Sequence, residues 1–302
     1  MSVPHRRLGR TEERVSMVGL GGFHIGHPYL PDDEAIDLIH AAIDRGITFM
    51  DNSWDYNSGM SELRMGRALC VAGYRDRAFL MTKLDGRTKT SFARQLDESL
   101  ARLLTDHIDL IQFHENIRPD DADRIFAEGG AFEAALEAKA AGKVRYIGFT
   151  GHKNPRLHLH MLDLAAERNF TFDTVQMPLN VFDAHYESFE KLVLPRALEL
   201  DMGVLAMKTF GDKFLLETHA VDPIDMLHYG MNLPTSVVIT GIDKPEVLDQ
   251  AIAAAESFAP LSPERVAAIL QKSAAPARDG SKELYKTTRF FDSTAQNPSW
   301  LG

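Results

Sequence analysis

The chain has 302 residues, 44% of them hydrophobic and 25% charged, which is enough material for a large folded core. A net charge of −10 argues against nucleic acid or an anionic membrane surface as a partner, because both attract clustered lysine and arginine. The sequence has no apolar run of membrane-spanning length, no signal-peptide-like N-terminus, and one cysteine, Cys70, which cannot form an internal disulfide. We therefore expect a cytoplasmic protein without a membrane or nucleic-acid partner.

Short apolar runs alternate with longer amphipathic stretches along the chain. A hairpin is expected around residues 9–13, and the first helix has acidic residues in its first turn and Gly46 as its stop. The expected strands cover residues 16–22, 47–51, 78–83, 107–114, 144–151, 173–180, 203–211 and 236–241. The expected helices cover residues 32–46, 61–73, 90–104, a long stretch ending at 143, 156–169, 185–201, 222–231 and 244–258.

These elements make eight strand–helix units, and the strands are continuous apolar runs, as parallel strands buried on both faces should be. Eight such units favour a closed (β/α)8 barrel of the TIM type, with an N-terminal β-hairpin. A doubly wound open sheet is the alternative, because periodicity does not show whether a sheet closes. We expect a single domain over residues 1–302, with its core at about 16–258 and an irregular C-terminal tail at 274–302.

Four polar residues lie where a barrel places its working site, at or just past the carboxyl ends of strands. Asp51 ends the second expected strand, Lys83 ends the third and His114 ends the fourth, while Tyr56 follows Asp51 closely. Each residue taken alone has a plainer explanation, such as a helix cap, a rim aromatic or a solvated lysine. Their recurrence at successive strand ends favours a shared site.

Together the four side chains are suited to donate a proton to a carbonyl oxygen. A tyrosine hydroxyl keeps its proton up to about pH 10, and a nearby ammonium group is expected to lower that pKa. A buried lysine needs a carboxylate partner to keep its charge, a role that Asp51 can fill. We expect Tyr56 as the general acid, tuned by Lys83 and Asp51, with His114 as a second donor to the substrate oxygen.

Several stretches of the sequence resemble the successive motifs of the aldo-keto reductases: LGRTEERVSMVGLGG, FMDNSWDYNSGMSELRMGRAL, LARLLTDHIDLIQFH and AGKVRYIGFTGH. The resemblance extends from about Leu8 to about Ser257. It implies a (β/α)8 barrel that transfers hydride between a nicotinamide cofactor and a small carbonyl substrate, an aldehyde or ketone. The tetrad of that family falls on Asp51, Tyr56, Lys83 and His114, which implies the roles given above.

The family's nicotinamide contacts match this chain less completely. Gln176, at the end of the sixth strand, fits the glutamine that contacts the nicotinamide amide; a core-edge glutamine is the alternative. The family usually has Ser-Asn after the fifth strand, where this chain has Thr150 and Gly151. Thr150 keeps the hydroxyl, and His152 is the candidate to replace the missing amide.

The remaining cofactor contacts are also atypical. Met207 stands where the family commonly stacks a tyrosine, and Lys208 is a candidate for the pyrophosphate; core packing and a solvated lysine are the alternatives. Asp243 precedes Lys244 at the last helix, and an acid there repels a 2′-phosphate and suits a free ribose hydroxyl. We expect NADPH, with NADH as the alternative. The further cofactor-binding candidates are Gly22, Phe23, Gly241 and Gln250.

The substrate pocket is expected to be formed by Phe23 and His24, after the first strand, and by Trp54. Ordinary packing is the alternative for aromatic residues of this kind. The tail is a further candidate to cover the pocket, through Phe290, Phe291 or Trp300. The sequence names neither the substrate nor the oligomeric state.

Two other functions stay open from the sequence. A metal-dependent barrel hydrolase would gather His24, His27, His114 and His152 with an aspartate around zinc, although the chain has no tight ligand motif such as H-E-x-x-H. A non-catalytic cofactor-binding protein on the same barrel would explain the altered cofactor contacts, whereas the complete tetrad argues against it. We expect the enzyme, without a bound metal.

Overall fold

The computed structural model describes residues 3–302 and confirms the closed barrel. Eight parallel strands pair in chain order, and β10 closes the ring by pairing with β3. The barrel strands are β3 (Val18–Gly21), β4 (Phe49–Asp51), β5 (Phe79–Leu84), β6 (Ile108–Phe113), β7 (Val144–Thr150), β8 (Thr174–Pro178), β9 (Gly203–Met207) and β10 (Val237–Gly241). Most strand residues are buried, because side chains fill the barrel on one face and helices cover the other.

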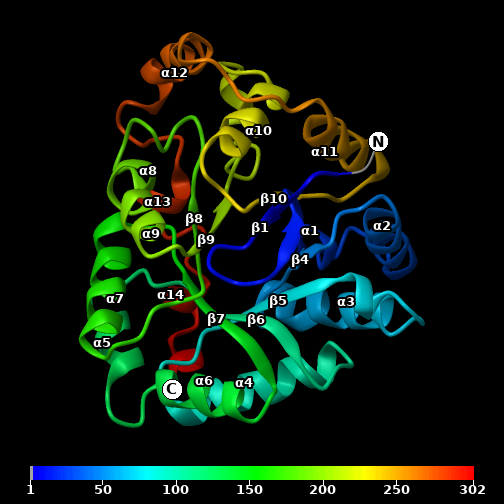
Figure 1. The fold of residues 1–302 in the computed structure, drawn as a ribbon, viewed down its shortest axis with the longest axis vertical. Helices are drawn as coiled ribbons and strands as arrows, with labels where there is room; N and C mark the ends of the chain where they lie inside the picture. The colour runs from blue at the N-terminus through cyan, green and yellow to red at the C-terminus, as the bar shows by residue number, and fades with distance from the viewer. Residues whose placement is uncertain (1–2) are drawn as a thin grey trace.

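Figure 1 shows the strands at the centre of the molecule and the helices around them. The helices that alternate with strands are α1 (Gly22–Ile25), α2 (Asp32–Asp44), η1 (Tyr56–Gly59), α3 (Met60–Leu69), η2 (Arg75–Arg77), α4 (Lys89–Arg102), α5 (Asp121–Phe126), α6 (Ala131–Ala140), α7 (Pro155–Glu167), α8 (Phe189–Leu192), α9 (Leu194–Glu199), η3 (Leu216–Thr218), α10 (Pro223–Asn232) and α11 (Pro245–Ser257). The C-terminal segment contains α12 (Pro263–Ala277), α13 (Leu284–Thr287), α14 (Ser293–Gln296) and η4 (Pro298–Leu301). Among residues 3–302, no helix combines the length and the apolar composition needed to cross a bilayer.

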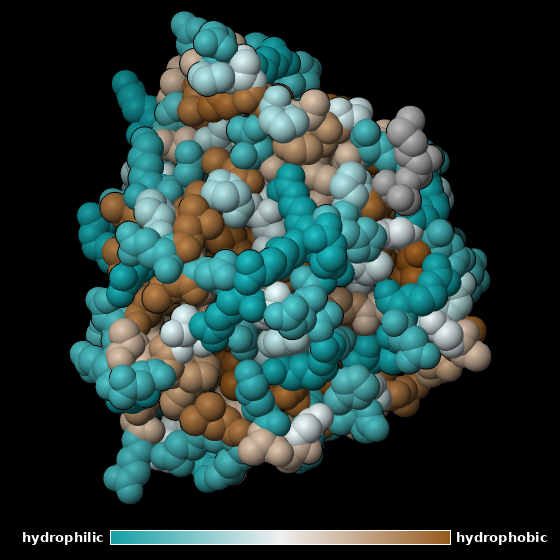
Figure 2. All heavy atoms as spheres, viewed as in Figure 1, coloured by the Kyte–Doolittle hydropathy of each residue, from teal (hydrophilic) through white to brown (hydrophobic). Residues whose placement is uncertain are grey.

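The expected N-terminal hairpin is present and packs into one end of the barrel. Its strands, β1 (His5–Arg7) and β2 (Arg14–Ser16), pair antiparallel. Leu8 and Val15 from this hairpin are fully buried in one cluster with side chains of the barrel strands. In Figure 1 the hairpin, coloured blue, crosses the centre of the view, and Figure 2 shows hydrophilic side chains over the middle of the same face.

Three helical segments differ from expectation. The long helix expected before residue 143 is divided into α5 and α6, because Gly129 adopts a left-handed φ of +71° between them. The helix expected over 185–201 is divided at Val193, just before Pro195, which has no backbone N–H to donate. The tail expected to be irregular, residues 274–302, contains the short helices α13, α14 and η4. Helix α12, which no expected element covers, begins before that tail, and Ser262 caps it by accepting a hydrogen bond from the Arg265 N–H.

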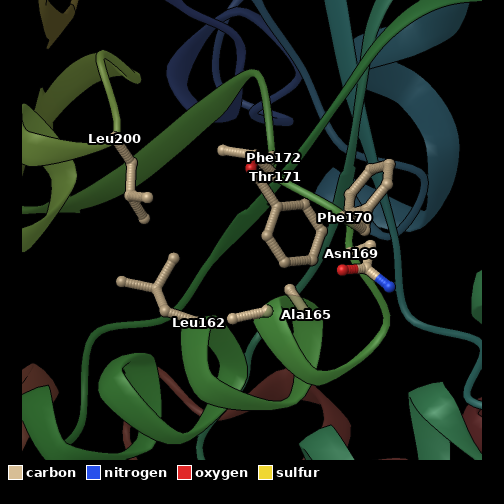
Figure 3. A pocket seen from close by; sticks show the side chains of 8 residues that line it. Leu162, Ala165, Asn169, Phe170, Thr171, Phe172 and Leu200 are labelled. Carbon is tan, nitrogen blue, oxygen red and sulfur yellow. The ribbon is translucent and has the colours of Figure 1, made fainter.

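A cavity of about 300 Å³ lies beside helix α7, at the end of the barrel where the strands begin. Figure 3 shows its lining side chains. They are Leu162, Ala165, Ala166, Asn169, Phe170, Thr171, Phe172 and Leu200, and none of them is ionisable. This cavity therefore offers no group for acid–base chemistry.

Candidate active site

Three adjacent strand ends bring together the four polar residues singled out from the sequence. Asp51 is the last residue of β4, Lys83 lies within β5, and His114 follows β6 directly. The Nζ atom of Lys83 lies 2.6 Å from Asp51 Oδ1 and donates a hydrogen bond to the hydroxyl of Tyr56 at 3.2 Å. The rings of Tyr56 and His114 meet edge to face, with centroids 5.9 Å apart. The four side chains form one contiguous cluster.

The Lys83–Asp51 pair is withdrawn from solvent. Lys83 is 1% exposed and Asp51 is 4% exposed, so each charge depends on the other. Lys83 also donates to the backbone oxygen of Asn52 at 2.7 Å, and its Nζ lies 4.6 Å from the centre of the Tyr56 ring. Burial raises the pKa of Asp51, and the attraction of Lys83 opposes that shift. The ammonium group is therefore fixed against the tyrosine.

Tyr56 is held by an unusual turn. The residues that follow it, Asn57, Ser58 and Gly59, have left-handed φ values of 52°, 58° and 85°. Such values are unfavourable for residues with a side chain and persist only where other contacts hold them. One such contact is the hydrogen bond from Asn57 Nδ2 to the backbone oxygen of Phe23, at 2.7 Å. The turn directs the tyrosine toward Lys83 rather than along a helix.

The pKa of Tyr56 is raised well above its ordinary value in the free protein, so the expected lowering by Lys83 is wrong for this state. Burial is the main cause, because it disfavours the phenolate, and the carboxylates Asp51 and Asp55 add to the effect. The sequence shows the lysine but does not show how many acids surround the hydroxyl. Tyr56 is consequently a neutral hydrogen-bond donor at physiological pH.

Acidic residues that the sequence reasoning missed surround His114. Asp85 Oδ1 lies 2.8 Å from Nδ1 of the imidazole, and Asp55 Oδ1 lies 3.4 Å from the same nitrogen. Ser53 Oγ donates to Asp55 Oδ1 at 2.5 Å and lies 3.2 Å from His114 Nδ1. Asp85 follows β5 directly and Glu115 is the second residue after β6, so both belong to the same pattern of polar residues just past strand ends.

The C-terminal tail is bonded to this acidic cluster. Ser293 donates its hydroxyl to Asp55 at 2.6 Å, and both its N–H and its hydroxyl reach Glu115 Oε1 at 2.9 Å. Thr294 donates its N–H and its hydroxyl to Glu115 Oε2, at 2.9 Å and 2.6 Å. Asp292 of the same segment lies 3.1 Å from His152 Nε2. The tail thus covers the part of the site next to His114.

The candidates for the nicotinamide amide lie close to the same strand ends. Gln176 is 1% exposed, and within residues 3–302 its Oε1 atom accepts no hydrogen bond. A side chain on Gly22 would stand 2.5 Å from the Asp51 oxygen, and one on Gly151 would stand 2.5 Å from the Asn116 oxygen. Both glycines therefore allow two backbone segments of the protein to approach each other closely. The unsatisfied buried acceptor of Gln176 fits a ligand with an amide donor.

The cofactor-binding candidates at and just past the ends of β7 and β9 contact each other or the C-terminal tail. Thr150 is buried at the end of β7, with its hydroxyl 4.0 Å from the sulfur of Met207. Lys208 has a φ of +60°, and its Nζ lies 4.2 Å from the ring centre of Phe291 in the tail. Burial lowers the pKa of Lys208 to about 8. His152 is bonded to Asp292, so it is engaged by the tail in this state.

The candidates for the adenosine end lie on and after β10. A side chain on Gly241 would overlap the ring of His24, whose Nε2 lies 3.7 Å from Asp212. Asp243 accepts a hydrogen bond from the Tyr29 hydroxyl at 2.9 Å. Lys244, at the N-terminus of α11, is exposed, and Gln250 within the helix is half-buried.

Two of the aromatic residues expected in the substrate pocket, Phe23 and Trp54, differ in exposure. Phe23 is 44% exposed, and its ring meets that of Tyr56 edge to face at 5.5 Å, so it is placed to form a pocket wall. Trp54 is 8% exposed, donates its indole N–H to Glu98 at 2.7 Å and packs against Trp300 at 5.4 Å. Its indole is engaged within the protein, and the expected substrate contact of Trp54 stays a prediction.

The histidines considered for a zinc site do not gather. Among residues 3–302, the group whose geometry could hold a metal ion comprises Asp55, Asp85 and His114. His24 and His152 pair instead with Asp212 and Asp292. The 2.8 Å contact between His114 and Asp85 is an ordinary hydrogen bond, which accounts for this cluster without a metal.

Comparisons with known proteins agree with this architecture. A model of the aldo/keto reductase family matches residues 17–228. L-galactose dehydrogenase of Arabidopsis thaliana is 32% identical over 155 residues, which are 48% of this chain and 48% of that protein. The aldo-keto reductase YhdN of Bacillus subtilis is 32% identical over 209 residues, 63% of this chain and 57% of that protein. The chain thus spans about half of the length of these curated relatives, 48% and 57%.

Solved structures support the same fold. The aldo-keto reductase AKR11C1 of Bacillus halodurans, in its holo form, superposes with a TM-score of 0.74 over 93% of this chain and 99% of that one, at 21% identity. A putative aldo-keto reductase of Pseudomonas aeruginosa gives a TM-score of 0.69 over 84% of this chain and 95% of that one, at 25% identity. From the family match and the barrel geometry together, we conclude that this chain belongs to the aldo/keto reductase family.

Proposed function

We propose that the protein is a nicotinamide-dependent oxidoreductase that reduces an aldehyde or ketone to the alcohol, or catalyses the reverse oxidation. The observation that supports this most directly is the contact of Lys83 Nζ with both Asp51 and the Tyr56 hydroxyl, beside the ring of His114. A buried ion pair is weak evidence of added stability, and ionisable groups held together in this way are typical of catalytic sites. The same arrangement argues against a non-catalytic protein on this barrel.

In this proposal Tyr56 is the general acid. Its raised pKa keeps the proton in place until a stronger base, the alkoxide-like oxygen of the reacting carbonyl, forms beside it. Lys83 then stabilises the phenolate that Tyr56 becomes, and Asp51 keeps Lys83 charged without water. His114 donates a hydrogen bond to the same carbonyl oxygen and orients it.

The cofactor would be held along the ends of β3 and β7 to β10. The orphaned Gln176 oxygen fits the carboxamide, with Thr150, Gly151 and Met207 beside it. When bound, the nicotinamide supplies or accepts the hydride. The residues proposed for the pyrophosphate and adenosine are Lys208, Gly241, Asp243, Lys244 and Gln250, with His152 and Phe23 near the nicotinamide.

NADPH stays our proposed cofactor, with NADH as the alternative. Lys244 is exposed and available for a 2′-phosphate, whereas Asp243 is occupied by the Tyr29 hydroxyl. That hydrogen bond reduces the repulsion that an unpaired Asp243 would exert on a phosphate. A reducing, cytoplasmic location is part of the proposal, because the single cysteine, Cys70, is an exposed free thiol.

The test is a screen of aldehydes, ketones and aldoses with both reduced cofactors, followed by the variant Tyr56→Phe. We expect the variant to lose at least about a hundredfold in kcat while it keeps cofactor affinity, because it lacks only the hydroxyl group that carries the transferable proton. Tyr74→Phe is the matched control, since Tyr74 is a partly exposed tyrosine bonded to Asp44 outside the site. Equal rates in both variants would remove Tyr56 from the mechanism, and failure of the wild type to bind either cofactor would refute the function.

A further inference from the structure

His114 is held at only one of its two ring nitrogens. Within residues 3–302, all of its side-chain hydrogen bonds involve Nδ1, which lies 2.8 Å from Asp85 Oδ1 and 3.2 Å from Ser53 Oγ. Nε2 has no such partner, and the ring lies edge to face with Tyr56. The free nitrogen of this imidazole is therefore the one available to a substrate beside Tyr56.

Asp85 is built into the protein as the anchor of that ring. It is 0% exposed, and within the described chain its second oxygen, Oδ2, makes no hydrogen bond. Gln95 Oε1 accepts from the backbone N–H groups of Asp85 and Gly86, at 2.9 Å and 2.7 Å. The buried guanidinium of Arg87 donates to the backbone oxygens of Asp85 and His114, at 2.8 Å and 2.7 Å. The loops that carry the carboxyl group and the imidazole are thus tied together.

We propose that Asp85 is a positioning residue for His114: its buried carboxyl group holds Nδ1, fixes the ring with Nε2 toward the substrate, and keeps a proton on Nε2. This inference rests on the oxidoreductase function proposed above. It adds a role for a residue outside the tetrad.

The proton count explains why a carboxyl group is needed at this place. With two protons, the Asp85–His114 pair has one between Oδ1 and Nδ1 and one on Nε2, so Nε2 donates to the carbonyl oxygen. With one proton, that proton stays between Oδ1 and Nδ1, and Nε2 becomes an acceptor that repels the carbonyl oxygen. Such a pair titrates as a unit rather than as two separate groups. Loss of the proton from Nε2 should therefore slow carbonyl reduction.

The charges around His114 favour the doubly protonated pair. Burial and the neighbouring Asp55 raise the pKa of Asp85 to about 7. Burial lowers the pKa of His114, but Asp55, Asp85 and Glu115 outweigh that effect, so the pKa is raised. The titratable or charged groups around the imidazole are Asp51, Asp55 and Tyr56 after or at the end of β4, Lys83 and Asp85 on and after β5, and Glu115 after β6.

The test compares wild type with Asp85→Asn, which keeps the size of the side chain and removes its charge. NMR of the labelled ring nitrogens, without substrate or cofactor, should show the pKa of His114 lowered by about one unit or more. The signal is assigned by its loss in His114→Gln. The rate of carbonyl reduction should fall by about tenfold or more at about pH 8 and recover to within about threefold at about pH 6, where the imidazole regains its proton.

Asp109→Asn is the matched control, because Asp109 is 4% exposed and lies at the start of β6, bonded to Arg145 and the Leu80 N–H. It should change stability without moving the His114 titration or the pH profile. A loss in Asp85→Asn that is equal at all pH values, or a His114 titration that does not move, would overturn the inference. If Asp85→Asn shifts the His114 titration but the wild type reduces no carbonyl, the Asp85–His114 pairing would be supported and the oxidoreductase function refuted.

Discussion

Lys83 is the residue on which the other groups of the site depend. Its Nζ meets three acceptors, the Asp51 carboxylate, the Asn52 backbone oxygen and the Tyr56 hydroxyl. A buried ammonium group with a full set of acceptors has a fixed position and little freedom to leave. Its contact with Tyr56 is therefore a property of the folded chain before any ligand binds.

Replacement of Asp51 by asparagine should destabilise the fold, because it leaves Lys83 as a buried charge without a counter-ion. We expect the free energy of unfolding, measured by urea denaturation, to fall by about 3 kcal/mol. Asp97→Asn is the control, since Asp97 pairs with Lys143 at 2.7 Å on the exposed surface, where such a change costs about 1 kcal/mol or less. Similar losses in the two variants would show that the Lys83–Asp51 pair is not isolated from water.

At the scale of single residues, the sequence predicts the positions of the site better than its electrostatics. The strand-end rule identified Asp51, Lys83 and His114, because a polar residue that ends an apolar run has few structural reasons to be there. It did not reveal that Asp85 folds back to His114, since the path of a loop depends on contacts such as those of Arg87. The direction of the Tyr56 pKa also depends on carboxylates gathered from separate loops.

At the scale of elements, the tail is the segment most clearly attached by polar contacts. Ser293 and Thr294 make their hydrogen bonds to Glu115 and Asp55, and Phe290 beside them is 63% exposed. Tyr285 before this stretch and Leu301 after it are buried, so the stretch between them is the part held mainly by hydrogen bonds. Segments held by few apolar contacts open more readily than those packed into a core. We therefore expect the stretch around Ser293 to be the part of the tail that moves when a ligand enters.

The double variant Ser293→Ala, Thr294→Val tests this attachment. It removes the hydroxyl donors to Glu115 and Asp55 and leaves the backbone N–H groups in place, so we expect the tail to open several-fold more often. Trypsin cleavage after the exposed Arg289 measures the opening. Ser281→Ala, at an exposed position, should leave the cleavage rate unchanged. A double variant as resistant as the wild type would place the anchor elsewhere, for example at Asp292.

The strands were the most predictable elements and the long helices the least. Each barrel strand must be apolar on both faces, which leaves a clear mark in the sequence. The division between α5 and α6 depends on a left-handed glycine, Gly129, and a glycine near a helix end is an ambiguous signal. Helix α12 was missed although Ser262 and Pro263 form a standard N-terminal pair, because the stretch lies after the last strand–helix unit.

At the scale of the whole molecule, the hairpin is the part that fills the end of the barrel where the strands begin. Leu8 is 0% exposed there and shares a cluster with Phe49, Leu110 and Leu205 from three strands. Gly9 beside it needs its left-handed φ of +52° and leaves no space for a side chain against Gly203. The eight strands are therefore packed from within as well as by their helices.

Leu8→Ala should destabilise the barrel, because it leaves a cavity that the surrounding strands cannot fill. We expect the free energy of unfolding to fall by about 2–5 kcal/mol, measured by thermal or urea denaturation. The matched control is Leu136→Ala, since Leu136 is 40% exposed on helix α6 and loses little buried surface. Comparable losses would mean that the hairpin is only loosely docked.

The attachment of the tail has a consequence for the timing of catalysis. The hydroxyls of Ser293 and Thr294 bond to the same carboxylates, Asp55 and Glu115, that set the charge around His114. When the tail lifts, those carboxylates exchange protein donors for water, and the local dielectric rises together with access. Opening of the tail and the protonation of His114 are then coupled. In the open site, water screens the carboxylates that keep Nε2 of His114 protonated, and closure over a substrate restores their full effect.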